Sequence, residues 1–275
     1  MFTLNCKGRL LVIESPLVMG IINATPDSFY ENSRVMGASN ILEQAEKMLT
    51  EGADILDIGG QSTRPGSTQL NEEEELSRII EPIKSLHHHF PETIISVDTY
   101  HSKVALEAVS AGASIVNDIS GGNLDEKMLS TVGKLRLPYI CMHMQGSPQT
   151  MQKEPHYENV TREVLDFFIK KIEDCKKAGI HDVIIDPGFG FGKTIKHNFE
   201  LLKNFSVLKM LEKPLLAGIS RKSTIYKTLG ITANEALNGT TVLNTIALLN
   251  GANILRVHDV KEAKEAVKLI SNAFS

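Results

Sequence analysis

Short apolar runs alternate with longer helix-like stretches along the chain. Eight runs begin near Leu17, Ile55, Ile94, Ile115, Pro138, Val183, Pro214 and Ile254. Their mean spacing of about 34 residues is close to the length of one strand–helix unit. Between them, apolar residues recur at helical spacing, as in Leu42, Ala45, Met48 and Leu49, or Val164, Leu165, Phe168, Ile169 and Ile172. The pattern predicts strands that alternate with helices.

One junction recurs where the predicted helices end. Gly52, Gly112 and Gly251 each stand in the form x-Gly-Ala-polar-Ile, and Gly179 lies in a looser copy. Glycine is common just past a helix C-terminus because it adopts the left-handed backbone conformation at little cost. Each junction therefore predicts the end of a helix followed by a strand.

Eight alternating units indicate an α/β protein with a (β/α)₈ TIM barrel. An open, doubly wound parallel sheet is the alternative. Residues 1–15 precede the first barrel strand and are expected to form a short N-terminal extension, a hairpin at the base of the barrel. Because no linker-like or low-complexity stretch divides the chain, residues 1–275 are predicted to form one domain.

Composition narrows the function classes. The 275 residues carry a formal net charge of −4, without the basic excess typical of nucleic-acid binding. No apolar run reaches the length of a transmembrane helix, and the N-terminus lacks a signal-peptide core. The three cysteines, Cys6, Cys141 and Cys175, form no CxxC pair and are expected to be structural thiols. These features predict a cytoplasmic protein in a reducing compartment.

Polar residues follow all eight predicted strands, at the place where barrel enzymes carry their chemistry. Any one of them could be a helix cap, but eight together favour a ligand site. The candidate acceptors are Asp98, Asn117 and Asp186, and the candidate donors are Arg64, Lys222, Arg256 and His258. A ligand with an amide- or guanidine-like donor edge and an anionic tail would suit both sets. Thr63 and Arg64 lie in a loop suited to phosphate.

Three other sequence patterns give weaker evidence for a functional site. The segment Asp186–Lys193 resembles a phosphate-binding P-loop, but Pro187 occupies the position of the required first glycine. The consecutive histidines 87–89 would point in different directions on a helix, so we expect solvated side chains and no metal site. His143 is expected to be a hydrogen-bonded structural histidine.

Eight segments, in order and one per strand end, identify a family resemblance. They are GIINATPDSF (20–29), DIGGQSTRPGS (57–67), SVDTY (96–100), IVNDISGG (115–122), MHMQGSPQTMQ (142–152), IDPGFGFGK (185–193), GISRKS (218–223) and RVHDV (256–260). Together they resemble the dihydropteroate synthases, which are pterin-binding TIM barrels. The last three segments favour this family over other pterin-binding barrels.

The resemblance implies a transferase of folate biosynthesis and a target of sulfonamides. It would condense 6-hydroxymethyl-7,8-dihydropterin diphosphate with 4-aminobenzoate, giving 7,8-dihydropteroate and pyrophosphate, by a dissociative, SN1-like mechanism. Mg²⁺ would be the cofactor, and a homodimer is the expected assembly. The partners would be these small-molecule substrates, without nucleic acid or membrane.

The resemblance also implies roles for residues. The pterin site would comprise Asp98, Asn117, Asp186, Lys222 and Arg256, with Asp98, Lys222 and Arg256 catalytic. The pyrophosphate site would comprise Thr63, Arg64, Arg256 and His258. The aminobenzoate site would comprise Phe29, Pro65, Phe191 and Ser223. Asn23 is the position associated with the metal.

Two alternatives remain beside the synthase. One is a methyltetrahydrofolate-binding methyltransferase, which shares the barrel and the pterin site but needs no pyrophosphate grip. The other is a non-catalytic pterin-binding homologue. One departure from the family pattern concerns the first loop, where Tyr30-Glu31-Asn32-Ser33 replaces Ser-Asp-Gly-Gly. This change puts the flexibility of that loop in doubt.

Overall fold

The computed structural model describes residues 1–24, 34–61, 69–151 and 154–274. Its main sheet has eight parallel strands in the order β8-β7-β6-β5-β4-β3-β10-β9. These strands are β3 (Leu17–Asn23), β4 (Ile55–Gly59), β5 (Ile94–Asp98), β6 (Ile115–Asp118), β7 (Tyr139–Met142), β8 (Val183–Asp186), β9 (Leu216–Ala217) and β10 (Ile254–Val257). A parallel bridge between Ile185 and Leu215 brings the two ends of the sheet together. The predicted (β/α)₈ barrel is confirmed, and the open sheet is wrong.

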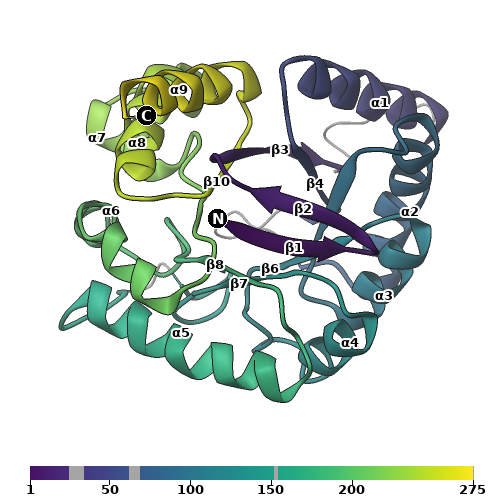
Figure 1. Ribbon diagram of the computed structural model, residues 1–275, viewed down its shortest axis with the longest axis horizontal. Helices are drawn as coiled ribbons and strands as arrows, with labels where there is room; N and C mark the ends of the chain where they lie inside the picture. The colour runs from purple at the N-terminus through teal and green to yellow at the C-terminus, as the bar shows by residue number, and fades with distance from the viewer. Residues whose placement is uncertain (25–33, 62–68, 152–153, 275) are drawn as a thin grey trace.

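Helices surround the strands, as Figure 1 shows. They are α1 (Arg34–Thr50), α2 (Glu72–His89), α3 (Ser102–Ala111), α4 (Met128–Leu135), α5 (Val160–Lys177), α6 (Ile195–Lys203), α7 (Ser223–Leu229), α8 (Leu237–Leu249) and α9 (Val260–Ala273), with the 3₁₀ segments η2 (Phe205–Leu211) and η3 (Ala233–Glu235). Asn71 caps α2 in a capping box with Glu74, which satisfies two backbone amides of the first turn. None of the described helices is long and apolar enough to cross a membrane.

The hairpin expected in the N-terminal extension is present. β1 (Phe2–Cys6) and β2 (Arg9–Ile13) pair antiparallel, and Figure 1 shows them lying across one end of the barrel. Leu4, Cys6 and Ile13 pack there against the lowest interior layer of the barrel. The hairpin therefore closes the end of the barrel at which the strands begin, and leaves their carboxyl ends for a site.

On five of the eight barrel strands the interior changes from apolar to polar within two residues. The lower layer contains Leu17, Met19, Ile55, Ile94, Ile115, Ile140, Ile184, Leu216 and Ile254. Alternate strand residues point to the same face, so the residues two positions later also face inward. On five strands these are Asp57, Ser96, Asn117, Asp186 and Arg256. The register thus places polar groups inside the barrel, directly above a dry layer.

Most of the predicted local signals agree with the structure. Gly52, Gly112, Gly179 and Gly251 all have positive φ, as expected for residues that end helices. The three cysteines are free and buried. Within the apolar stripe of α5, Val164 and Phe168 are buried, while Ile169 is 54% exposed.

Candidate active site

Arg256 connects two aspartates inside the barrel. Its Nε lies 2.6 Å from Asp57 Oδ2, and its Nη2 lies 2.6 Å from Asp98 Oδ2. Asn117 Nδ2 donates to the same Asp57 oxygen at 3.0 Å. Strands β4, β5, β6 and β10 supply these four groups, and the parallel register aligns their carboxyl ends. Side chains far apart in the sequence therefore form one connected polar cluster.

Burial raises the pKa of two carboxyl groups at this end of the barrel, those of Asp98 and Asp186. Burial raises the pKa of Asp98 to about 7, against the opposing effect of the Arg256 guanidinium. Burial also raises the pKa of Asp186, and Lys222 opposes that shift. Asp57 is completely buried, and its Oδ1 has no hydrogen-bond partner. Several carboxyl groups thus share a dry interior with two cations, as at ligand sites that need a fixed pattern of charge.

Lys222 lies at the edge of the loop that follows β8. Its Nζ donates to the carbonyl oxygen of Phe189 at 2.5 Å and lies 4.7 Å from the centre of the Phe191 ring. Burial lowers the pKa of Lys222 to about 8, while the Asp186 carboxylate opposes the shift. Asp186 itself accepts a hydrogen bond from the Gly188 amide at 2.8 Å. This lysine is therefore placed between an acidic strand end and an aromatic ring.

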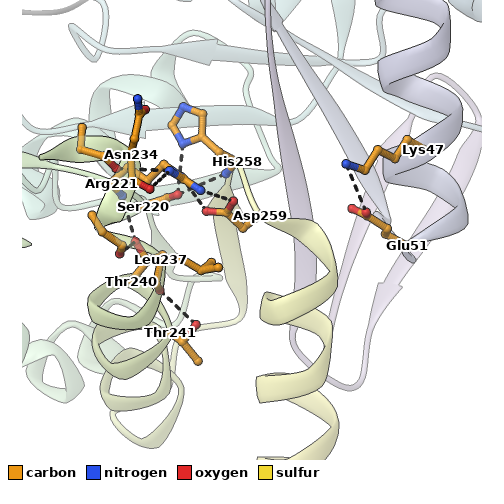
Figure 2. Close-up of polar contacts among 12 residues, drawn as sticks. Lys47, Glu51, Ser220, Arg221, Asn234, Leu237, Thr240, Thr241, His258 and Asp259 are labelled. Atoms are coloured by element: carbon orange, nitrogen blue, oxygen red, sulfur yellow. Dashed lines mark hydrogen bonds and ion pairs between the residues drawn. The ribbon is translucent and has the colours of Figure 1, made fainter.

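His258 and Ser220 link the loops after β10 and β9 (Figure 2). Ser220 Oγ lies 3.1 Å from His258 Nδ1, and the His258 amide donates to the same hydroxyl at 3.2 Å. Beside them Arg221, at φ 53°, donates from Nε and Nη2 to both oxygens of Asp259, at 2.9 and 2.7 Å. Figure 2 shows these side chains converging from the two loops. The bidentate pair fixes the loop that carries Lys222 relative to the loop that carries His258.

The comparisons with known proteins agree with this geometry. The family profile described as "Pterin binding enzyme" matches residues 19–258. The dihydropteroate synthase of Escherichia coli K12 is 42% identical over 272 residues, covering 98% of this chain and 95% of the relative. The chain belongs to the dihydropteroate synthase family.

Solved structures of this family share the fold over nearly the whole chain. A Yersinia pestis dihydropteroate synthase in a sulfonamide drug complex has a TM-score of 0.92 at 40% identity, covering 99% of this chain and 98% of that one. A Xanthomonas albilineans dihydropteroate synthase with 4-aminobenzoic acid has a TM-score of 0.92 at 38% identity, covering 98% and 97%. The ligand of the second structure is the aminobenzoate that the family resemblance implies as a substrate.

The residues expected from the resemblance divide into three groups. Asp98, Asn117, Asp186, Lys222 and Arg256 lie inside or at the carboxyl end of the barrel. Ser223 begins α7 directly after Lys222, Phe191 is buried beside that lysine, and Asn23 ends β3 opposite Gly59. Phe29, Thr63, Arg64, Pro65 and the altered Tyr30–Ser33 segment lie outside the described residues.

Two polar residues of the region were not among the expected site residues. Asp57 accepts from both Arg256 and Asn117, and its place two residues after the interior Ile55 could have identified it. Lys193 is 2% exposed and donates to the ring of His143, which makes His143 the structural histidine that was expected. Lys193 ends the segment that resembles a phosphate-binding P-loop, a function that Pro187 at the position of the first glycine argues against.

Among the residues that the structure describes, the Asn23 side chain provides an oxygen at the position predicted for Mg²⁺. The described residues contain no group of three His, Cys, Asp or Glu side chains that could hold a metal. Asn23 offers an amide oxygen at the end of β3. Mg²⁺ commonly keeps several waters and binds through one or two protein oxygens together with substrate phosphates. The donor set therefore fits a metal that arrives with a diphosphate.

Proposed function

We propose that this protein condenses 6-hydroxymethyl-7,8-dihydropterin diphosphate with 4-aminobenzoate, giving 7,8-dihydropteroate and pyrophosphate. The observation that carries the proposal is the buried polar layer of the barrel, in which Arg256 joins Asp57 and Asp98. A buried group of this kind is costly to maintain without a ligand or a partner for each polar atom. The family relationship indicates which reaction to expect, and the buried polar layer provides side chains that would recognise the substrate.

The pterin ring has a donor edge that matches the acidic groups. Its 2-amino group and ring N–H would donate to the carboxylate of Asp186, which presents two parallel acceptors. Asn117 and Asp98 would complete the acceptor side of the site. Lys222 would donate to the pterin carbonyl, and Arg256 would stack on the ring face. The side chains on rigid strands would thus orient the ring before reaction.

The diphosphate requires positive charge near the mouth of the barrel. Thr63, Arg64, Arg256 and His258 are the proposed partners of its oxygens. Asn23 would hold Mg²⁺, which neutralises charge on the leaving group when it is bound. The Ser220–His258 contact fixes the histidine ring, so its direction does not depend on the ligand. Cationic donors here favour departure of pyrophosphate because they stabilise the charge it gains.

We propose that bond cleavage precedes bond formation. The bond between the methylene carbon and the diphosphate oxygen breaks, and both electrons leave with pyrophosphate. The resulting cation is spread over the pterin ring, where the Asp98 carboxylate stabilises it without acting as a nucleophile. The amine of aminobenzoate then attacks the methylene carbon and releases a proton to solvent. Phe29, Pro65, Phe191 and Ser223 would hold the aminobenzoate for this attack.

One assay tests the reaction directly. Purified protein with Mg²⁺ and both substrates should release pyrophosphate and form dihydropteroate, and no release at saturation would overturn the proposal. Lys222→Ala and Asp186→Asn should each lose most of the activity while their circular dichroism spectra stay native. Oxygen-isotope scrambling within labelled pterin diphosphate, with an aminobenzoate analogue present, tests the order of the bond changes. Absence of scrambling under every condition would contradict prior C–O cleavage.

The alternative functions make different predictions. A methyltetrahydrofolate-binding methyltransferase would bind the pterin without depending on His258 or on diphosphate. A non-catalytic homologue would bind pterin diphosphate and release no pyrophosphate. The described site residues favour the synthase, since Lys222, Arg256 and His258 all stand at the carboxyl end of the barrel.

We also propose a homodimer in the cytoplasm, inhibited by sulfonamides that compete with aminobenzoate. Helix α8 (LNGTTVLNTIALL) carries no charged residue, and helices without a charged face are normally buried. Yet Val242 and Leu249 are 50% and 52% exposed on it, with Leu229 of α7 at 55%. A second copy of the chain would cover this face. Val242→Glu combined with Leu249→Glu should give monomers by analytical ultracentrifugation, whereas an unchanged sedimentation coefficient would place the contact elsewhere.

A further inference from the structure

Lys193 is buried, and none of the hydrogen-bond partners described for its Nζ is a carboxylate. The side chain is 2% exposed, and its Nζ lies 3.0 Å from the carbonyl oxygens of both Gly188 and Phe191. The same Nζ lies 2.9 Å from His143 Nδ1 and 3.4 Å from the His143 carbonyl oxygen. Burial lowers the pKa of Lys193 to about 7, while the nearby Asp186 carboxylate opposes that shift. In its charged form the ammonium group only donates, so the histidine nitrogen accepts. Three strong hydrogen bonds therefore use the whole donor capacity of this lysine.

The contacts of Lys193 hold one loop against its neighbour. The loop between β8 and α6 approaches the loop after β7 so closely that a Cβ on Gly188 would lie 2.0 Å from the His143 carbonyl oxygen. Gly188 also has φ +68°, a conformation that favours glycine. Burial and the nearby Lys193 charge lower the pKa of His143 to about 2, so its ring stays neutral as an acceptor. The lysine thus adds side-chain contacts between the two loops just beyond the last backbone hydrogen bond of the strand pair, from the His143 amide to the Asp186 carbonyl oxygen.

A second lysine contacts the same loop from the other side. Lys222 donates to the Phe189 carbonyl oxygen, while Lys193 donates to the carbonyl oxygens on either side of it, at Gly188 and Phe191. Under the proposed function Lys222 also donates to the pterin, so its bond to the loop competes with the substrate. Lys193 faces His143 and makes no such contact. Its hold on the loop therefore persists through the reaction.

We propose that Lys193 is a positioning residue for aminobenzoate. It holds the β8–α6 loop so that Phe191 and the Phe189 carbonyl keep their places while Lys222 engages the pterin. This inference rests on the proposed function, because Phe191 is assigned to the aminobenzoate site there. Asp98, Asn117 and Asp186 lie on strands, and this loop contacts the pterin site through the Gly188 amide and the Phe189 carbonyl oxygen. We therefore expect pterin binding to depend less on the loop than aminobenzoate binding. The two substrates should respond differently to loss of the lysine.

The test replaces Lys193 with methionine, which is similar in length and cannot donate. Lys196→Met is the matched control, because Lys196 is exposed one turn further along at the start of α6. In Lys193→Met we expect the KM for aminobenzoate to rise at least tenfold. The Kd for pterin diphosphate, measured by calorimetry, should change less than threefold. Hydrogen exchange of the 187–194 peptide should accelerate in Lys193→Met and stay unchanged in Lys196→Met.

Lys193→Gln provides a second variant, since its amide can still donate to one of the carbonyls. It should recover part of the aminobenzoate KM and part of the exchange protection. Equal losses for both substrates, or an aminobenzoate KM within threefold of the parent, would overturn the proposal. Unfolding of both variants would also overturn it, because the lysine would then serve the whole fold. A parent protein without synthase activity refutes the proposed function instead, and hydrogen exchange still reports on the loop.

Discussion

Replacing Asp57 with asparagine tests whether the buried cluster acts as a unit. The side chain is completely buried, and its Oδ2 accepts from Arg256 Nε at 2.6 Å and from Asn117 Nδ2 at 3.0 Å. Asparagine has almost the same shape, so no cavity forms. It removes one negative charge. Its amide oxygen can take the place of Oδ2, which puts the N–H₂ group at the place of Oδ1, an atom without a partner among the described residues. Arg256 then keeps an ion pair with Asp98 alone of the two positions.

The structure sets the size of the effect. A hydrogen bond to a charged group contributes roughly 1.5–3 kcal/mol, and removing one partner of a buried ion pair costs roughly 3–5 kcal/mol. The asparagine oxygen can still accept both hydrogen bonds and Asp98 still pairs with Arg256, so we expect the lower end, about 2 kcal/mol of unfolding free energy. A misplaced Arg256 would lose a similar amount of transition-state binding. Since about 1.4 kcal/mol corresponds to a factor of ten, kcat/KM for pterin diphosphate should fall about 30-fold.

Urea unfolding and pyrophosphate release measure the two quantities separately. Asp54→Asn is the control, because Asp54 contacts Lys264 and the Val18 amide before β4 begins, at the opposite end of the barrel. Its side chain is 28% exposed, so it should lose at most about 1 kcal/mol of stability and no activity. If Asp57→Asn folds and keeps kcat/KM within threefold, Arg256 does not depend on Asp57, and the reasoning fails.

Three further predictions concern buried groups. Burial raises the pKa of Glu75 from 4.5 to about 8, so between these values the folded protein holds more protons than the unfolded chain, and stability falls as pH rises. Urea titrations should therefore show Glu75→Gln gaining stability relative to the parent from pH 5 to pH 8, while the exposed Glu81→Gln shows no such trend. Gly188→Ala should lose about 1–2 kcal/mol from its left-handed φ alone, and more from the contact with the His143 carbonyl, as thermal unfolding would reveal; an unchanged Tm would be inconsistent with the loop geometry. Because the pKa of Asp98 is raised to about 7, kcat/KM should fall as pH drops below that value, and the Asp98→Asn profile should lack this acidic limb.

Much of the architecture could be predicted from local patterns. The apolar runs located all eight barrel strands, because a strand that is buried on both faces needs an unbroken apolar stretch. The start near Pro214 differs most, since β9 begins at Leu216 and contains only two residues. The recurrent glycines marked helix ends because each adopts a positive φ there, a conformation that glycine takes at little cost. These signals depend on neighbouring residues and so are present in the sequence.

The site was only partly predictable. Position at strand ends, together with the family resemblance, named Asp98, Asn117, Asp186, Lys222 and Arg256. Neither signal distinguished a group that faces substrate from one that holds another side chain. Asp57 was passed over for that reason, although it holds Arg256 and Asn117.

The sequence by itself determined the order of the strands and helices and the chemical types available at each strand end. Tertiary structure alone decided which of those groups meet. Arg256 and Asp57 are 199 residues apart in the chain, and closing the barrel brings them within 2.6 Å. Lys193 likewise finds its partners only because two loops pack together above the sheet. Such contacts depend on the register and closure of the barrel, and the free energy of burying these groups arises only once water has been excluded.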